Sequence, residues 1–255
     1  RRGAGVNAIG AIDMALWDIK GKYENKPVYE LMGGNFHKTI TPYASLQPLG
    51  SSFEEYRDSL VEWAEKARNL GFRAVKSEVT MNGPYAHNGM EENDEKHTLV
   101  LEAVRKALGP EIKLMVDVQY KWKTAEDALR TVKDWEEFDI YFLETPVWTD
   151  SLEDYARMHE EAPMKIAAGE WLSTSHEFYD LITKGKIDVA QPDIGRVGGL
   201  TEAKKVSKLA DQFDRIIVPH CWKTSISISA TAHFAFNTPS CKFIEYLPPQ
   251  LCHET

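Results

Sequence analysis

The sequence contains little cysteine and no long hydrophobic run, and both absences narrow the class of protein. Three cysteines, Cys221, Cys241 and Cys252, occur in 255 residues, an odd number without paired spacing. Disulfide frameworks use even sets at short spacings, so a reducing compartment is expected. No stretch approaches the roughly 18 apolar residues of a membrane span, and the amino-terminus lacks the apolar segment of a signal peptide. We therefore expect a cytoplasmic protein without a membrane partner.

The sequence also lacks a basic excess. It has 30 lysines and arginines against 39 acidic residues, a net charge of −9. Nucleic-acid binding needs a basic face that neutralises phosphates, and no stretch supplies one, so a nucleic-acid partner is not expected. The length suits a single barrel of strands and helices, which typically takes about 250 residues.

Short apolar runs that end in an acidic residue recur along the chain. The acids are Asp117 (LMVD), Glu144 (YFLE), Glu170 (AAGE), Asp193 (AQPD) and Glu245 (FIE). The first four follow at intervals of 27, 26 and 23 residues, and His220 (IIVPH) comes 27 residues after Asp193. One strand plus one helix takes about that length, so each charged residue is expected at the carboxyl end of a strand. This pattern predicts a TIM-type (β/α) barrel whose active site lies at that end.

Apolar periodicity places the elements of this barrel. Ile9, Ile12, Leu16 and Ile19 predict a helix over 6–22 with one packed face. Ser52 with Glu55 predicts a capping box that begins another helix, and the polar segment 82–93 predicts a long loop. Strands are expected near 40–47, 74–79, 113–118, 140–144, 165–169, 188–192, 215–219 and 242–246.

Asp117, Glu144 and Glu170 end three consecutive predicted strands. Three carboxylates this close would repel one another and raise their pKa values unless a cation lies among them. An all-oxygen set suits Mg²⁺ better than zinc, so a magnesium site is predicted. The alternative is that each acid pairs with a lysine or arginine on the barrel rim.

The next strand ends carry Asp193 and His220. A carboxylate beside an imidazole fixes its tautomer and raises its basicity, as a general base or acid requires. Lys76 and Glu78, two residues apart on a strand, share one face. Lys76 is predicted to hold a substrate carboxylate, with a plain ion pair to Glu78 as the alternative.

The loop over 82–93 is the candidate for reading the substrate. Its side chains Tyr85 and His87 are predicted to contact substrate hydroxyl groups, because loops at the carboxyl ends of barrel strands carry binding residues.

Several motifs in order resemble the enolase superfamily, and within it the mandelate racemase subgroup. They are NAIGAIDMALWDIKGK from Asn7, VDV at Asp117, LETP at Glu144, AAGE at Glu170, QPDIGRVGG at Asp193, VPHC at His220 and FIEY at Glu245. The resemblance covers nearly the whole chain. It implies a modified barrel that binds Mg²⁺ through Asp117, Glu144 and Glu170, where a base removes the proton next to a substrate carboxylate to give an enediolate. It further implies that Asp193 and His220 form the dyad and that Glu245 donates a hydrogen bond to that carboxylate.

One position departs from the subgroup. Many members carry Lys-X-Lys at the end of the second strand, whereas here Glu78 takes the place of the second lysine. A two-base racemase would lack its partner base, so the resemblance implies an acid-sugar dehydratase, in which His220 removes the proton and assists loss of the β-hydroxyl. Glu78 is then expected to bind a sugar hydroxyl, act as the acid or pair with Lys76.

The domain expected for residues 1–255 is the catalytic barrel, without the amino-terminal α+β capping domain of the family. The resemblance also implies a homo-oligomer of even number. Rival readings are a racemase, epimerase or lactone cycloisomerase on the same scaffold, a Schiff-base aldolase that uses Lys76, and a barrel with only a structural or binding role.

Overall fold

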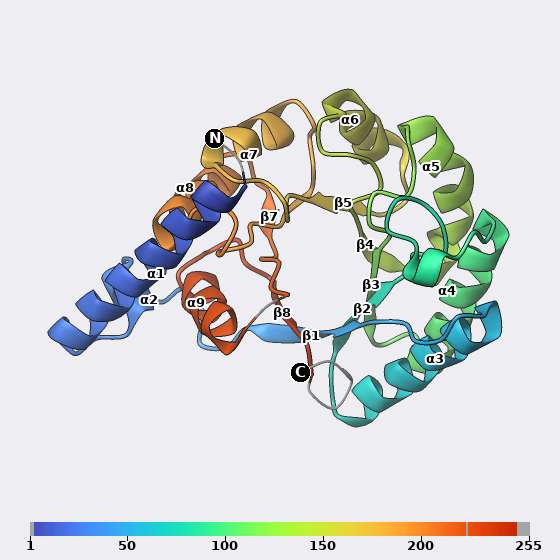
Figure 1. Ribbon diagram of the computed structural model, residues 1–255, viewed down its shortest axis with the longest axis horizontal. Coiled ribbons are helices and arrows are strands. Elements are labelled where there is room, and N and C mark those ends of the chain that lie inside the picture. Colours follow the sequence, from blue (N-terminus) through green and yellow to red (C-terminus); the bar gives the residue numbers. More distant parts are fainter. Residues whose placement is uncertain (1–2, 223, 249–255) are drawn as a thin grey trace. The chain divides into compact units, whose positions relative to one another are not determined.

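The computed structural model describes residues 3–222 and 224–248, which divide into two compact units. The central unit is Pro42–Ala167 together with residues 247–248, and the terminal unit joins residues 3–41 to Ala168–Tyr246. Strands and helices alternate along the chain (Figure 1). The alternation is the one expected for parallel strands joined by helical crossovers.

The central unit has its strands in the spatial order β5-β4-β3-β2-β1, and each strand pairs with its neighbour in parallel. Its elements are β1 (Thr41–Leu46), α3 (Phe53–Asn69), β2 (Ala74–Glu78), the short 3₁₀ helix η1 (His87–Gly89), α4 (Asp94–Leu108), β3 (Lys113–Asp117), α5 (Ala125–Val132), η2 (Lys133–Phe138), β4 (Ile140–Glu144), α6 (Leu152–Glu161) and β5 (Lys165–Ala168).

In the terminal unit β6 pairs with β7 in parallel. Its elements are α1 (Ala4–Glu24), α2 (Val28–Leu31), α7 (Ser175–Thr183), β6 (Val189–Ala190), α8 (Leu200–Gln212), β7 (Ile216–Ile217), α9 (Ser225–Phe236) and β8 (Phe243–Tyr246). All eight predicted strands are therefore confirmed, each within two residues at either end.

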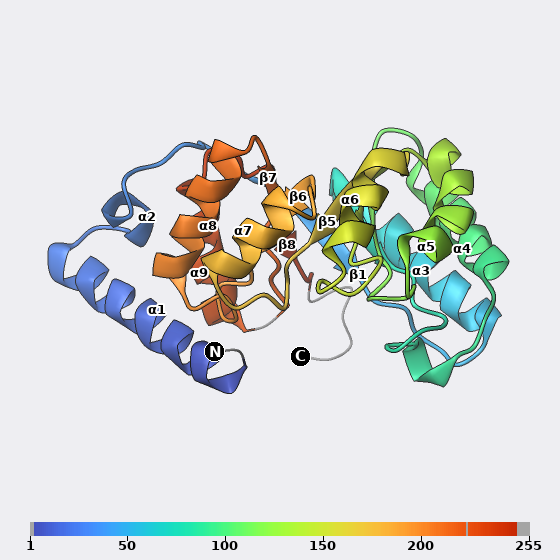
Figure 2. The same cartoon turned by 90° about the horizontal axis from the view of Figure 1, so that it is seen from above.

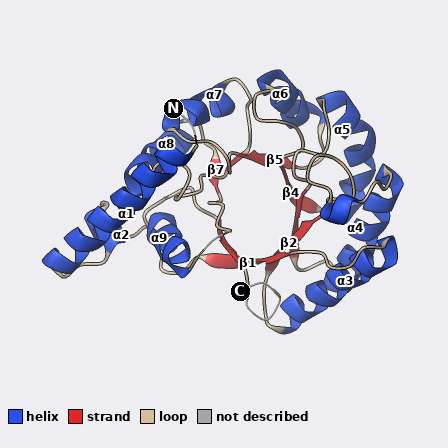
Figure 3. Cartoon of the chain, in the orientation of Figure 1, coloured by secondary structure: helices blue, strands red, loops and turns tan. Residues whose placement is uncertain are grey.

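The core of the central unit lies between its strands and the helices α3 to α6, which run along the outer side of the strands (Figure 3). Strands β2, β3 and β4 are buried along almost their whole length, as parallel strands covered on both faces are. The predicted capping box is present, because the Ser52 side chain accepts from the Glu55 amide and Glu55 binds the Ser52 amide in return. Segment 82–93 is a loop apart from η1, as predicted.

Helix α1 lies beside α8 in the terminal unit (Figure 2). It packs there through a glycine and an acid. A side chain at Gly10 would come within 3.1 Å of the Gly199 amide, and Asp13 accepts a hydrogen bond of 3.0 Å from the Thr201 amide in the first turn of α8. The prediction that the apolar face of α1 is packed is wrong for the described residues. The four apolar side chains of this face are about 60% exposed: Ile9, Ile12, Leu16 and Ile19.

Two of the three cysteines can be placed. Cys221 and Cys241 are both buried. Burial raises the pKa of Cys241 to about 12, so this thiol is not reactive. Cys252 lies outside the described residues. Across 3–222 and 224–248, none of the helices is both long enough and apolar enough to traverse a bilayer.

Candidate active site

Strand register brings three predicted acids to one level in the central unit. Glu78 is opposite Asp117 on the neighbouring strand, and Asp117 is opposite Glu144 on the next. Parallel strands aligned in this way end together, so their last side chains are neighbours along one edge. The predicted grouping of Asp117 with Glu144 is therefore present, and Glu78 joins it.

Hydrogen bonds orient the two deeper carboxylates. The Lys76 ammonium donates to Oε2 of Glu144 at 2.8 Å, and both side chains are almost completely buried. Oδ1 of Asp117 accepts from the Gln119 amide and from the Thr145 hydroxyl, each at 2.9 Å. Both carboxylates are buried away from water, so these hydrogen bonds are what stabilises their negative charges.

Glu78 is held by its own strand end and by helix α3. Its carboxylate accepts a 3.1 Å hydrogen bond from the Thr80 hydroxyl, and its carbonyl accepts one of 2.9 Å from the Tyr56 phenol. Burial raises the pKa of Tyr56, so the phenol stays protonated and continues to donate. Glu78 is thus fixed in place at the end of β2.

The terminal unit contains the predicted dyad. Nδ1 of His220 lies 2.8 Å from Oδ2 of Asp193, and both side chains are buried. The other Asp193 oxygen accepts from the amides of Gly195 and Arg196 at 2.8 and 3.1 Å. Asp193 therefore accepts a hydrogen bond from the imidazole at one oxygen and is anchored by the following loop at the other. This arrangement assigns the Nδ1 proton to the bond with Asp193 and directs Nε2 away from it.

Glu170 lies on the other side of the same imidazole. Its Oε2 is 3.1 Å from Nε2 of His220 and 3.2 Å from the Arg196 guanidinium. The guanidinium in turn stacks 3.7 Å above the ring centre of Trp171. Glu245, the last predicted residue of this unit, is buried and accepts a 2.7 Å hydrogen bond from the Cys221 amide, one residue past His220.

The acids around His220 change its protonation. Burial acts to lower the pKa of His220, but Glu245, the hydrogen bond to Asp193 and the charge of Glu170 together raise it above the ordinary histidine value. A base with a raised pKa holds an abstracted proton more firmly. The acids that surround His220 therefore favour its protonated form in this structure.

The two predicted substrate-contact residues in the 82–93 loop differ in how far their side chains are exposed. Tyr85 is 47% exposed. His87 instead lies against the protein, with Nε2 2.9 Å from the Gly50 carbonyl and its ring 5.5 Å from that of Tyr56. The contacts of His87 hold the loop, and those of Tyr85 leave its ring accessible.

The donor chemistry of the predicted metal ligands suits a hard cation. Asp117 and Glu144 are buried carboxylates adjacent in register, and their side chains offer only oxygen. In the part of the chain that the structure describes, no cluster of three or more His, Cys, Asp or Glu side chains has metal-holding geometry. The complete ligand set stays a prediction.

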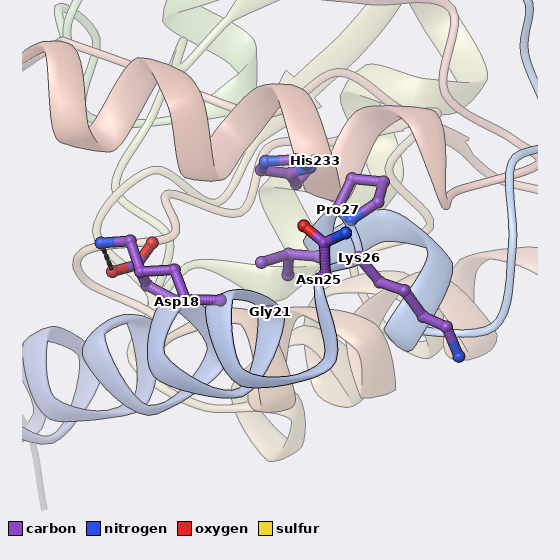
Figure 4. A pocket seen from close by; sticks show the side chains of 8 residues that line it. Asp18, Gly21, Asn25, Lys26, Pro27 and His233 are labelled. Carbon is purple, nitrogen blue, oxygen red and sulfur yellow. Dashed lines mark hydrogen bonds and ion pairs between the residues drawn. The ribbon is translucent and has the colours of Figure 1, made fainter.

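A pocket on the terminal unit involves none of the predicted site residues. It measures about 340 Å³ and lies at the carboxyl end of α1, beside α9 (Figure 4). Its lining residues are Asp18, Gly21, Lys22, Asn25, Lys26, Pro27, Val28 and His233. The predictions made for the strand ends therefore do not depend on this pocket.

Three residues at these strand ends were not identified from the sequence. Thr145 binds Asp117, Arg196 binds Glu170, and Trp148 follows Glu144 by four residues. Arg196 lies inside the motif QPDIGRVGG, three residues after Asp193, so its position in the sequence could have identified it as a site residue. Thr145 likewise lies inside the motif LETP, directly after Glu144, whereas Trp148 lies outside the quoted motifs and its ring partners are far away in the sequence.

Comparison with known families matches most of the chain. Residues 59–254 match the family described as "Enolase C-terminal domain-like", and residues 3–33 match "Mandelate racemase / muconate lactonizing enzyme, N-terminal domain". The second match covers α1 and α2 and shows that the sequence includes part of the region assigned to the amino-terminal domain in that family.

Two curated relatives have different activities. A D-galactarolactone cycloisomerase of Agrobacterium fabrum is 32% identical over 92% of this chain, and an arabinonate dehydratase of Saccharolobus solfataricus is 32% identical over 94%. The chain spans 58% and 61% of the lengths of these relatives. Sequence identity therefore does not separate the two reactions.

Solved structures agree on the fold. The 3,6-anhydro-D-galactonate cycloisomerase of Zobellia galactanivorans is 35% identical, with a TM-score of 0.85 over 100% of this chain and 67% of that one. An enolase from Bradyrhizobium in complex with magnesium and mandelic acid is 29% identical, with a TM-score of 0.81 over 96% of this chain and 62% of that one. The predicted (β/α) barrel class is confirmed by these likenesses.

Proposed function

From the premise that the chain belongs to the enolase superfamily, in its mandelate racemase group, we propose that it is the catalytic part of a magnesium-dependent sugar-acid dehydratase. The reaction removes the proton on the carbon next to the substrate carboxylate and eliminates the hydroxyl group on the following carbon. The product is a 2-keto-3-deoxy acid. The relatives that support this proposal are the arabinonate dehydratase and the wider family.

The observation that carries the proposal is the buried dyad of Asp193 and His220, whose Oδ2 and Nδ1 atoms are 2.8 Å apart. With Nδ1 bound to Asp193, Nε2 of the neutral imidazole has the lone pair that accepts the C2 proton. The resulting imidazolium then gives this proton to the departing C3 hydroxyl, which leaves as water. The enol that remains converts to the 2-keto acid, so one histidine serves as base and acid.

The other residues bind and orient in this proposal. Mg²⁺ held by Asp117, Glu144 and Glu170 would supply the positive charge that the substrate carboxylate needs while the neighbouring proton is removed. Lys76, whose ammonium lies 2.8 Å from the Glu144 carboxylate, is proposed to hold the substrate carboxylate. Glu245 is proposed to donate a hydrogen bond to the substrate carboxylate, which requires its protonated form. Glu78 is proposed to bind a sugar hydroxyl.

His220→Asn tests the dyad. The amide cannot take the proton at neutral pH, so we expect 2-keto acid formation on aldonates and aldarates to fall by about 10³-fold or more, in the range of general-base contributions. The assay is a screen of the full-length protein with Mg²⁺, with exchange of the C2 proton in deuterium oxide as a second readout.

The matched control is His176→Asn, which removes an exposed histidine on α7. It should leave both readouts unchanged. Magnesium affinity of His220→Asn, measured by calorimetry, should stay close to that of the parent protein. Unchanged turnover in His220→Asn would rule out the assignment of this residue as the base.

A second candidate is a lactone or anhydro-sugar cycloisomerase, favoured by the relatives of that activity at 32% and 35% identity. The same dyad would remove the same proton, but the leaving oxygen would stay in the molecule. Mass spectrometry of the product separates the two reactions. A dehydratase product has lost one water, whereas a cycloisomerase product has the mass of its substrate.

A further inference from the structure

Three aromatic side chains from three separate loops meet in the central unit. Tyr85 follows β2, Tyr120 follows β3 and Trp148 follows β4. The rings of Tyr120 and Trp148 are stacked, with centres 4.6 Å apart and planes 14° from parallel. The Tyr85 ring lies 6.0 Å from Tyr120 and 6.1 Å from Trp148 at a steep tilt. We call these three residues the aromatic platform.

The loops that carry Tyr120 and Trp148 are joined backbone to backbone. The amides of Val118, Tyr120 and Trp122 donate to the carbonyls of Glu144, Thr145 and Pro146 in turn. Gln119, Tyr120 and Thr145 have positive φ angles of 43°, 61° and 46°, although none is glycine. Such conformations cost free energy and persist only where the surroundings hold them, often at ligand sites.

The loop of Tyr85 is fixed as well. The Asn82 side chain binds the Glu92 carbonyl across the base of the loop, and Lys121 donates to Asn82 at 2.8 Å. His87 contacts the Gly50 carbonyl on the far side. Tyr85 is therefore presented from an anchored loop, and its ring does not have to be ordered when a ligand arrives.

The solvent exposure of two of its three rings distinguishes the aromatic platform from ordinary core packing. Tyr120 is only 2% exposed beneath its neighbours, but Tyr85 and Trp148 each keep 47% of their surface in solvent. Stacking against Tyr120 occupies one face of the Trp148 ring, so the exposed part of this side chain belongs to its remaining surface. A rigid group of exposed aromatic rings is a common feature of binding surfaces, because little side-chain entropy is lost on contact.

The platform also lies close in sequence to the predicted catalytic groups. Tyr120 is three residues beyond Asp117, and Trp148 is four beyond Glu144. The hydrogen bond from Thr145 to Asp117 and the bond from the Tyr120 amide to the Thr145 carbonyl connect the two sets directly. A substrate whose carboxylate lies at the acids would extend its remaining atoms along these loops.

We propose that the aromatic platform binds the ring of a cyclic sugar acid, such as a lactone or an anhydro sugar, by stacking on Trp148 and Tyr85. This inference rests on the sugar-acid function in its second form, in which the substrate is a lactone or an anhydro sugar, and it assigns the residues that bind the ring. A closed ring presents several C–H groups on one rigid face, which matches the negative face of an aromatic ring. An acyclic polyol has no fixed face and loses rotational freedom on contact.

Calorimetry with a cyclic and an acyclic sugar acid tests the proposal. The probes are D-galactarolactone and the acyclic acid D-galactonate, each with one carboxylate, and a His220→Asn background prevents their consumption. Trp148→Ala should weaken lactone binding by about tenfold, the loss expected for one aromatic stack, and D-galactonate binding by less than about twofold. Trp148→Phe should keep lactone affinity within about threefold, since it retains a ring.

Controls separate stacking from folding. Tyr179→Ala removes a tyrosine of α7 that is 49% exposed and should leave both affinities unchanged. Tyr85→Ala provides a second removal if Trp148→Ala is poorly folded, with the same preferential loss for the lactone. Equal losses for both probes, no loss, or no measurable lactone binding by the parent would each overturn the proposal.

A large fall in melting temperature with unchanged probe affinities would assign the platform to packing within the full-length protein and would also overturn the proposal. Because binding is measured without turnover, its outcome is independent of the 2-keto acid assay. Dehydration with no selectivity for rings would reject this inference alone, and ring binding without turnover of any sugar acid would reject only the proposed function.

Discussion

The Lys76 ammonium and the Glu144 carboxylate form a buried ion pair, 2.8 Å apart, with 4% and 0% of their side-chain surfaces exposed. Removing either charge from such a pair leaves the other without compensation in a region of low dielectric. Exposed pairs such as Lys66 with Glu62 on α3 are solvated and screened. A lysine–glutamate pair is therefore expected to affect stability more when it is buried than when it is exposed.

Lys76→Met should lower the free energy of unfolding by about 3 kcal/mol, because Glu144 loses its buried cation. Adding Glu144→Gln should recover part of the loss, giving a coupling energy of about 2 kcal/mol in a double-mutant cycle. Urea unfolding of the four proteins measures both quantities. The matched cycle at Lys66 and Glu62 should give at most about 0.5 kcal/mol. Similar values in both cycles would contradict this account.

The pairing of Asp193 with His220 was predictable from the sequence, and the contacts of Lys76 were not. Asp193 and His220 were identified because each ends a strand in a regular series, and the structure brings them within hydrogen-bond distance. Lys76 was expected to contact a substrate or Glu78, and it also binds Glu144, one strand beyond β3. Side-chain reach across two strands depends on register and rotamer, which spacing in the sequence does not specify.

Among the elements, α3 illustrates how local sequence determines where a helix begins. The Ser52 side chain accepts from the amide of Glu55, and the Glu55 side chain accepts from the amides of Ser51 and Ser52. These bonds satisfy amides that have no partner inside the helix. Helix α9 also begins after a threonine, Thr224, but its side chain makes no capping bond.

Ser52→Ala should therefore lower the free energy of unfolding by about 1 kcal/mol, the usual contribution of an N-cap side chain. Thr224→Ala is the matched control and should change stability by less than about 0.5 kcal/mol. Chemical denaturation followed by circular dichroism measures both. Equal losses in the two variants would show that the capping box does not stabilise α3.

Hydrophobic periodicity predicted which segments form helices better than it predicted which surfaces those helices contact. The apolar stripe of α1 correctly indicated a helix, but Ile9, Ile12, Leu16 and Ile19 are exposed in the described structure. Contact with α8 is made instead by Gly10 and Asp13. Amphipathic spacing shows that a helix has an apolar face, and it carries no information about which surface covers that face.

At the scale of the whole molecule, the order of strands and helices followed from the series of acid-terminated runs, because that repeat reflects the barrel itself. The aromatic platform and a buried polar network did not follow, since they join distant segments. In this network Lys121 donates to Asn82 and Asp94 and lies 3.1 Å from Nε2 of His97. The amide of Met81 also donates to Nε2 of His97. These bonds connect the 82–93 loop to α4 and to the segment after β3.

Burial, together with the nearby Lys121 charge, lowers the pKa of His97 to about 4, whereas the ordinary histidine pKa is 6.5. The folded protein therefore keeps His97 neutral at pH values where the unfolded protein binds a proton. Stability from this group is complete above about pH 6.5 and is lost progressively as the pH falls to about 4. A shift of this size corresponds to about 3 kcal/mol at the lower end of the window.

His97→Gln tests this linkage, since an amide can still accept from the Met81 amide but does not titrate. The free energy of unfolding, measured in urea at intervals from pH 7.5 to pH 4, should fall less steeply in the variant than in the parent. His176→Gln, which removes an exposed histidine, should keep the slope of the parent. Toward pH 4 the difference between the two curves should move in favour of His97→Gln by up to about 3 kcal/mol, because the neutral amide has no proton to gain in the unfolded state. Parallel curves across this window would show that the network around Lys121 tolerates a protonated His97, and the loop it anchors would then be insensitive to acid.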